Sequence, residues 1–141
     1  DLQNAIASLP DSQSQLGRVN KHTAYALLGK VLLYQDKFNE AASALDNIIG
    51  VYSLVSDYGS QFLRFGENGP ESVFEIQYSN QSNWYDWGCA HCSEGNYAII
   101  MNGPRGWSGP EYAQGWSFNV PTAEFYNSFE EGDSRRDATR W

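Results

Sequence analysis

The strongest constraint on the fold is a pair of apolar patterns within residues 21–50. Apolar side chains recur at helical spacing over residues 24–34 and again over residues 38–49, with a short polar turn between the two runs. Gly50 follows the second run, at a place where a left-handed residue would end a helix. The pattern therefore predicts two antiparallel helices joined by a tight turn.

The spacing inside this hairpin is more specific than ordinary amphipathicity. Gly29 and Ala41 are small residues where a tetratricopeptide unit lets its two helices approach closely. Large residues occupy the interlocking positions: Tyr25, Leu28, Leu32, Phe38, Leu45 and Ile48. At the position of Ile48, such units usually have a small residue. One unit cannot bury its own hydrophobic face, so we expect its neighbours to lie outside this segment or other layers to replace them. An ordinary helical hairpin in a larger core is the alternative.

Shorter helices are expected on both sides of the hairpin. Residues 2–9 carry a short apolar stripe that Asp1 can cap, and residues 58–65 suit a helical turn or two. Near the end of the chain, Thr122 is placed to cap a helix that Gly132 would terminate.

Between these helices the sequence changes character. Residues 72–78 alternate, which predicts a short strand with Phe74, Ile76 and Tyr78 on one face. Residues 79–118 are rich in Gly, Ser and Asn and have weak periodicity, and so long an irregular stretch is more often functional than not. The expected fold class is mostly α, with a tetratricopeptide-like hairpin and an irregular, loop-rich segment with short strands.

The charge balance excludes one class of partner. The chain of 141 residues has 9 basic and 17 acidic side chains, a formal net charge of -8. It has no basic excess that could release counterions from a nucleic-acid backbone, and an anionic membrane surface is disfavoured for the same reason. No run approaches the roughly 20 apolar residues of a membrane helix.

Aromatic residues are concentrated in the irregular segment. Aromatics make up 15% of the chain, and four of its 5 Trp lie within residues 84–116 among Asn, Asp and Arg. Flat rings stack on the apolar face of a sugar, and amides, carboxylates and Arg bind its hydroxyl groups. The candidate ligand-binding residues are Trp84, Tyr85, Trp87, Asn83, Asp86, Arg105 and Trp107. The alternative for any single ring is that it only packs the loop against the helices.

Cys89 and Cys92, with His91 between them, allow three interpretations. A redox pair would sit at a helix N-terminus, which this Gly-rich context does not provide. A zinc site needs four ligands, and the only other histidine is His22, far upstream. A short-range disulfide that stiffens a surface loop is the favoured interpretation, and no metal or cofactor is expected.

No spacing among the acidic residues marks a catalytic pair. A glycosidase needs two carboxyl groups at a defined separation, and the candidates near the aromatics are Asp86, Glu94, Glu111 and Glu124. Near the C-terminus, acidic and basic side chains alternate closely, which favours an ion-pair cluster that fixes a turn: Asp133, Arg135, Arg136 and Asp137.

Several stretches together resemble the SusD/RagB family. They are Gly17-Arg18-Val19-Asn20 through Leu32-Leu33-Tyr34, Tyr52-Ser53-Leu54 with Tyr58 and Phe62, Glu71-Ser72-Val73-Phe74-Glu75-Ile76-Gln77, and Pro121-Thr122 through Phe129-Glu130 to Gly132-Asp133-Ser134-Arg135-Arg136-Asp137. In the last stretch, Ser134 replaces the Pro that the family usually has. The resemblance covers about three-quarters of the chain, and no residue of the 79–118 segment matches a fixed motif.

The resemblance implies a function as well as a fold. Family members are surface nutrient-binding lipoproteins of Bacteroidetes that bind glycans without catalysis and form a lid on a SusC-like TonB-dependent outer-membrane transporter. Because they are several times longer, residues 1–141 would be an internal part of one such domain, and the lipid anchor would lie outside them. The rival interpretation is a tetratricopeptide-type protein-interaction module without a carbohydrate site.

Overall fold

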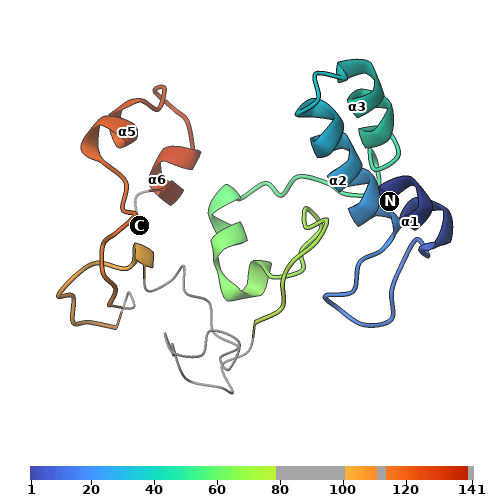
Figure 1. The fold of residues 1–141 in the computed structure, drawn as a ribbon. Helices are drawn as coiled ribbons and strands as arrows, with labels where there is room; N and C mark the ends of the chain where they lie inside the picture. Colours follow the sequence, from blue (N-terminus) through green and yellow to red (C-terminus); the bar gives the residue numbers. More distant parts are fainter. Residues whose placement is uncertain (79–100, 111–113, 140–141) are drawn as a thin grey trace. The chain divides into compact units, whose positions relative to one another are not determined.

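The computed structural model of the chain describes residues 1–78, 101–110 and 114–139 (Figure 1). The chain divides into two compact units, Asp1–Gln77 and Tyr78–Trp141. Over the described residues the regular structure is helical, with one isolated bridge between Ile49 and Tyr52 and no strand. The expected mostly helical fold is confirmed.

Three helices form the framework of the first unit: α1 (Leu2–Ser8), α2 (Lys21–Leu33) and α3 (Phe38–Leu45). Helix α2 packs against both α1 and α3, and it forms the predicted antiparallel hairpin with α3 (Figure 1). Asn20 begins α2, because its side-chain oxygen accepts a hydrogen bond from the Thr23 backbone N–H at 2.9 Å. Asp1 precedes α1 as expected, but its side chain accepts no capping hydrogen bond there.

Small residues bring α2 and α3 close together. Gly29 is buried, and Ala41 and Ala44 are only 3% and 6% exposed. A Cβ atom at position 29 would lie 2.6 Å from both Cγ and Cδ2 of Leu45, well inside van der Waals contact. The prediction that Gly29 and Ala41 permit the close approach is confirmed.

The second helix of the hairpin is shorter than the sequence predicts. Helix α3 ends at Leu45, and the Ile48 N–H then bonds to the Leu45 carbonyl at 2.9 Å, three residues back. These tighter turns replace the last helical turn that the apolar spacing suggested. Gly50 does adopt the left-handed backbone, with φ of 82°, but it lies beyond the turn and not directly after the helix.

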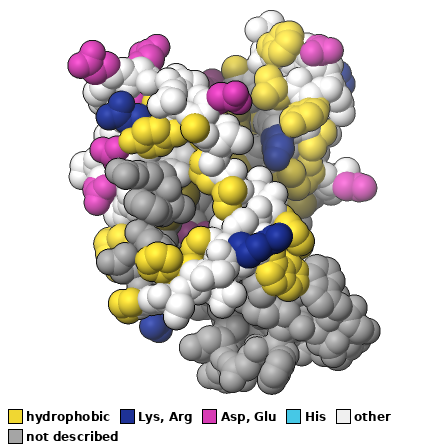
Figure 2. Space-filling view, turned by 90° about the vertical axis from the view of Figure 1, so that its left-hand side faces the viewer, with side chains coloured by type: hydrophobic (Ala, Val, Ile, Leu, Met, Phe, Trp, Pro, Cys, Tyr) yellow, Lys and Arg dark blue, Asp and Glu magenta, His cyan; other side chains and the backbone are white. Residues whose placement is uncertain are grey.

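The described residues do not cover the faces of the hairpin. Large apolar side chains of the hairpin remain exposed, among them Leu27, Leu33, Tyr34 and Phe38. The space-filling view shows groups of hydrophobic side chains at the surface (Figure 2). The buried residues of the hairpin are instead small ones, namely Ala24, Gly29, Ala41 and Ala44.

Two short 3₁₀ helices follow the hairpin, η1 (Tyr58–Phe62) and η2 (Arg64–Gly66), and they confirm the predicted helical turns. The predicted strand over residues 72–78 is wrong, because no other described segment pairs with it. The polar side chains of this stretch instead bond to the turn before it. Glu75 accepts from the Asn68 backbone N–H at 2.9 Å, and the amides of Gln77 and Asn68 bond to each other.

Two short helices of the second unit lie wholly within the described residues, α5 (Ala123–Asn127) and α6 (Arg135–Thr139). Thr122 caps α5 as predicted, with its hydroxyl oxygen 3.1 Å from the Phe125 backbone nitrogen. Gly132 has a left-handed φ of 84°, but α5 ends five residues before it. Among the described residues no helix has both the length and the apolar content that crossing a membrane requires.

Candidate functional site

Residues 101–110 and 114–118 of the second unit form a segment whose two sides run in opposite directions, with Met101 and Asn102 helical and the rest irregular. Three backbone hydrogen bonds join the sides: from Phe118 to Met101 at 2.8 Å, from Ser117 to Gly103 at 3.0 Å, and from Gly115 to Pro104 at 3.1 Å. The bonds are irregularly spaced, and so they form no regular ladder. We call this segment the aromatic loop. It contains two of the predicted site residues, Arg105 and Trp107.

Arg105 ties the two sides of the aromatic loop together. Its Nε and Nη2 atoms both donate to the carbonyl oxygen of Trp116, at 3.0 and 2.7 Å. Its backbone N–H donates to the Ser117 hydroxyl at 2.7 Å. Ser117 has a left-handed φ of 54°, a conformation that is uncommon for residues other than glycine. The bonds around Arg105 therefore stabilise a backbone shape that the sequence does not favour locally.

The rings of the loop lie next to this bonded framework. The ring centroids of Trp116 and Phe118 are 5.6 Å apart at a tilt of 53°. The Arg105 guanidinium carbon is 5.8 Å from the centre of the Phe118 ring, within range of a cation–π contact. Phe118 is nevertheless 67% exposed, and Trp107 is 36% exposed.

Trp107 is positioned by a close contact with a glycine. A Cβ atom at Gly109 would lie 2.8 Å from Cζ2 of Trp107, so the bare backbone at Gly109 lies against the indole. The loop thus presents partly exposed aromatic surface beside a guanidinium group. Aromatic surface with a few hydrogen-bonding groups suits a ligand that has both an apolar face and hydroxyl groups.

The structure gives Arg105 a role that sequence reasoning missed. It was predicted as a direct ligand for a sugar, and the structure shows that it bonds first to its own loop. Its Nη1 atom makes no hydrogen bond to any described residue, so contact with a sugar stays a prediction. The other candidates lie outside the described residues: Asn83, Trp84, Tyr85, Asp86 and Trp87, together with Cys89 and Cys92.

Phe118 was missing from the predicted site, and Trp116 was weighed only as one ring among several. The sequence gives no signal for the pair. Residues two apart share a side only in extended backbone, and Ser117 between the two rings has a left-handed φ of 54°.

The charged cluster near the C-terminus is structural, as predicted. Asp133 accepts hydrogen bonds from both the side chain and the backbone N–H of Arg135, and these bonds lower the pKa of its carboxyl from 3.8 to about 2. The Arg136 guanidinium lies 5.6 Å from the centre of the Tyr126 ring. The described residues contain no group of three His, Cys, Asp or Glu side chains that could hold a metal ion.

Comparison with known proteins shows what this chain is similar to. No family model matches the chain. The SusD-like protein P2 of Formosa agariphila is 31% identical over 142 aligned residues, which cover 96% of this chain. The surface glycan-binding protein A of Bacteroides thetaiotaomicron, solved in complex with laminarihexaose, matches 96% of the chain with a TM-score of 0.83 and 29% identity. The chain is therefore similar in sequence to a SusD-like protein and in fold to a surface glycan-binding protein, and we call it SusD-like in this sense.

Other solved structures are similar to the chain as well. Surface glycan-binding protein A from Bacteroides fluxus matches 97% of the SusD-like chain with a TM-score of 0.82 and 28% identity. A SusD superfamily protein from Bacteroides vulgatus matches 54% of it, with a TM-score of 0.50 and 33% identity. The SusD-like chain spans 27% of the Formosa relative and 32% of each of the two surface glycan-binding proteins, but only 17% of the Bacteroides vulgatus protein.

Proposed function

We propose that this SusD-like chain is part of a cell-surface protein that binds glycans and does not cleave them. The observation that supports this most is the similarity, over 96% of the chain, to a surface glycan-binding protein whose structure contains laminarihexaose. The aromatic loop adds independent chemical support, because it combines exposed rings with hydrogen-bonding groups in one segment.

The mechanism of binding follows from the geometry of the loop. The exposed ring of Phe118, with Trp107 nearby in the sequence, offers apolar surface to the C–H face of a pyranose. The Nη1 group of Arg105 bonds to no described residue, and we assign it as a donor to a ring hydroxyl. Because Arg105 already bonds to the Trp116 carbonyl, the loop loses little conformational freedom when a sugar binds, which favours affinity.

The wider role that we propose comes from the family. The ligand is an oligosaccharide or polysaccharide, and the intact protein delivers it to a SusC-like TonB-dependent transporter in the outer membrane. A lipid anchor outside this chain would hold the protein at the cell surface. Neither a cofactor nor a metal takes part, and affinity comes from stacking and hydrogen bonding alone.

Titration of the intact protein with laminarihexaose, cellohexaose and maltohexaose tests this function. We expect Phe118→Ala to weaken binding about tenfold, which corresponds to the loss of one stacked ring. The double variant Trp84→Ala with Trp87→Ala tests the predicted platforms in the same way. Phe65→Ala is the matched control, because Phe65 is 76% exposed but lies in η2 of the other unit.

Two results would contradict the proposal. If no saccharide in the panel binds, glycan binding is wrong. If reducing ends accumulate during incubation with the saccharide, the protein is an enzyme. If instead binding occurs but none of the loop variants changes it, glycan binding stands and the assignment of the aromatic loop is wrong.

One observation favours the rival function, a protein-interaction module. The hairpin exposes Tyr34 and Phe38, which are 81% and 60% exposed, and exposed aromatic side chains are typical of protein interfaces. The rival requires that the wild-type protein binds no saccharide of the panel, and that replacing both residues with Ser weakens its co-purification with a protein partner such as a SusC-like transporter. If the replacement weakens saccharide binding and not co-purification, the hairpin is no protein interface.

A further inference from the structure

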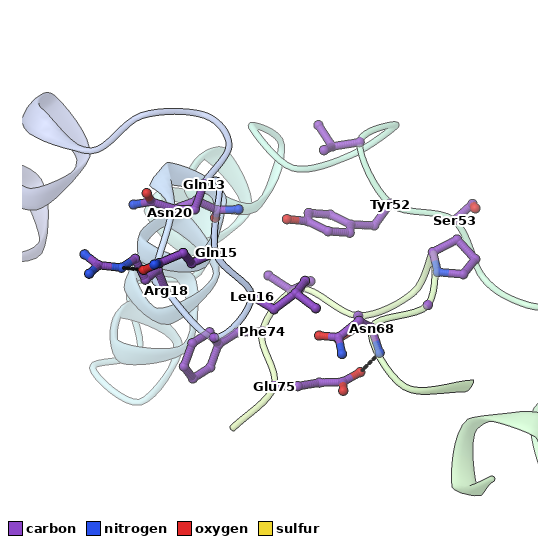
Figure 3. Close-up of a pocket in the computed structure, with 16 residues that line it drawn as sticks. Gln13, Gln15, Leu16, Arg18, Asn20, Tyr52, Ser53, Asn68, Phe74 and Glu75 are labelled. Atoms are coloured by element: carbon purple, nitrogen blue, oxygen red, sulfur yellow. Dashed lines mark hydrogen bonds between the residues drawn. The ribbon is translucent and has the colours of Figure 1, made fainter. Parts of the chain in front are cut away.

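We propose a second saccharide site, in the first unit, separate from the aromatic loop. Three segments of this unit, within residues 13–20, 51–53 and 68–75, enclose a cavity of about 360 Å³ (Figure 3). Small-molecule sites in proteins usually measure roughly 300–1,000 Å³, so the cavity has room for a small ligand or for one or two units of a longer one.

The lining of the cavity suits a neutral ligand rich in hydroxyl groups. Four amide side chains line it, namely Gln13, Gln15, Asn20 and Asn68. An amide both donates and accepts hydrogen bonds, as a hydroxyl group does, so the two match in either direction. The charged side chains of the lining are one arginine, Arg18, and one glutamate, Glu75, whose charges cancel.

Hydrogen bonds hold these side chains in place before any ligand arrives. Gln13 Nε2 donates to the Val19 carbonyl at 2.7 Å, and Gln15 Oε1 accepts from Arg18 Nε at 2.6 Å. Among the described residues, the Gln13 oxygen and the Gln15 nitrogen then have no partner. One acceptor and one donor therefore remain for a ligand, on side chains that are already ordered.

Tyr52 supplies the apolar surface of the site. Its side chain points into the cavity, with its hydroxyl directed toward Gln13 and Asn20 (Figure 3). The ring of His22 meets it edge-on, at a centroid distance of 6.0 Å and an angle of 88°, which fixes its orientation. A fixed aromatic ring beside several amides is the same combination that recognises a pyranose.

Other ligand classes fit the cavity less well. A metal ion would need several carboxylate or imidazole ligands, and the described part of the chain gathers no such group. An anion or a cation would leave one of the two opposite charges facing a like charge. An apolar ligand would leave the Gln13 oxygen and the Gln15 nitrogen without a partner among the described residues, which costs free energy. The choice of a saccharide rests on the proposed function, whereas the presence of a site rests on the cavity itself.

The test is a titration of the intact protein with laminarihexaose, combined with a crystal structure of the same complex. We expect two sites in the wild-type protein, of which Tyr52→Ala weakens one about tenfold. Gln15→Ala removes one amide, keeps the ring, and should weaken the same site about fivefold. The controls are Tyr34→Ala and Gln35→Ala, since both residues are exposed and lie outside the cavity.

The outcomes separate this proposal from the proposed function. If only the aromatic-loop site binds, or if another part of the protein's own polypeptide fills the cavity in the crystal, the second site does not exist and glycan binding stands. If Tyr52→Ala unfolds the protein, Gln15→Ala decides, because unchanged binding at both sites in that variant overturns the proposal. If no saccharide binds the wild-type protein at all, both proposals fail.

Discussion

Gly29→Ala offers the sharpest test of the hairpin packing, because two effects of opposite sign compete. In an open helix, replacing Gly with Ala stabilises the protein by about 1 kcal/mol. At position 29, however, the new Cβ atom would lie 2.6 Å from Cγ and Cδ2 of Leu45, whereas carbon atoms pack best at roughly 3.5–4.0 Å. Something must therefore move by about 1 Å.

The side chain of Leu45 is the group that can move. It is 39% exposed, so it can turn toward solvent and lose part of its packing against α2. Overpacking of this kind typically costs about 1–3 kcal/mol. Set against the gain in helix propensity, the net expectation is that Gly29→Ala lowers the free energy of unfolding by about 1 kcal/mol.

A double-mutant cycle with Leu45→Ala isolates the contact. Without the leucine side chain the clash disappears, so Gly29→Ala should now stabilise the protein by about 1 kcal/mol. The sign of the effect therefore reverses between the two backgrounds, with a coupling energy of about 2 kcal/mol. Urea unfolding of the intact protein, followed by far-ultraviolet circular dichroism, measures all four free energies.

Gly50→Ala is the matched control for this cycle. No atom lies within 4 Å of a Cβ built at Gly50, but its φ of 82° is left-handed. That conformation costs an L-residue about 1–2 kcal/mol, and the cost should be the same with or without Leu45. If Gly29→Ala stabilises the wild-type protein, or if its coupling to Leu45 is below about 0.5 kcal/mol, the close packing of α2 on α3 is not what requires glycine.

Three further predictions concern single side chains. Asn20→Ala should lower the free energy of unfolding by about 1 kcal/mol, measured by urea unfolding, because α2 loses its cap. Arg105→Lys keeps the charge but not the two bonds to the Trp116 carbonyl. It should therefore alter the near-ultraviolet dichroism of the tryptophans and weaken saccharide binding as much as Arg105→Ala does. Asp133 has a folded-state pKa lowered to about 2, so its carboxylate stabilises the fold above pH 3.8, and that stabilisation is lost as the pH falls toward 2. The stability difference between wild type and Asp133→Asn should shrink over that window and stay constant above it.

The hairpin could be predicted from the sequence because its determinants are local. Helical periodicity predicted the two helices, and the small residues Gly29 and Ala41 indicated where the helices contact each other. The end of α3 could not be predicted, because apolar residues at helical spacing continue past Leu45. Only the hydrogen bonds of the following turn, which form three residues apart, decide where the helix stops.

The strand expected over residues 72–78 failed for a different reason. Alternation shows that one side of a segment differs from the other, but a strand also needs a partner. Here the polar side is engaged by Asn68, which bonds to both Glu75 and Gln77. The same alternation in the sequence is therefore produced by side-chain contacts with a turn and not by a sheet.

Arg105 shows why the site was harder to predict than the fold. A sequence shows that an arginine stands among aromatic residues, and a guanidinium in such a place suits a sugar hydroxyl. It does not show that the nearest acceptor is the Trp116 carbonyl, 11 residues further along. A backbone acceptor cannot be identified from the sequence, because every residue has the same carbonyl group. If Arg105 positions the loop, replacing it changes affinity through Phe118 and Trp107, and so Arg105→Ala and Phe118→Ala should cost less together than the sum of their separate effects.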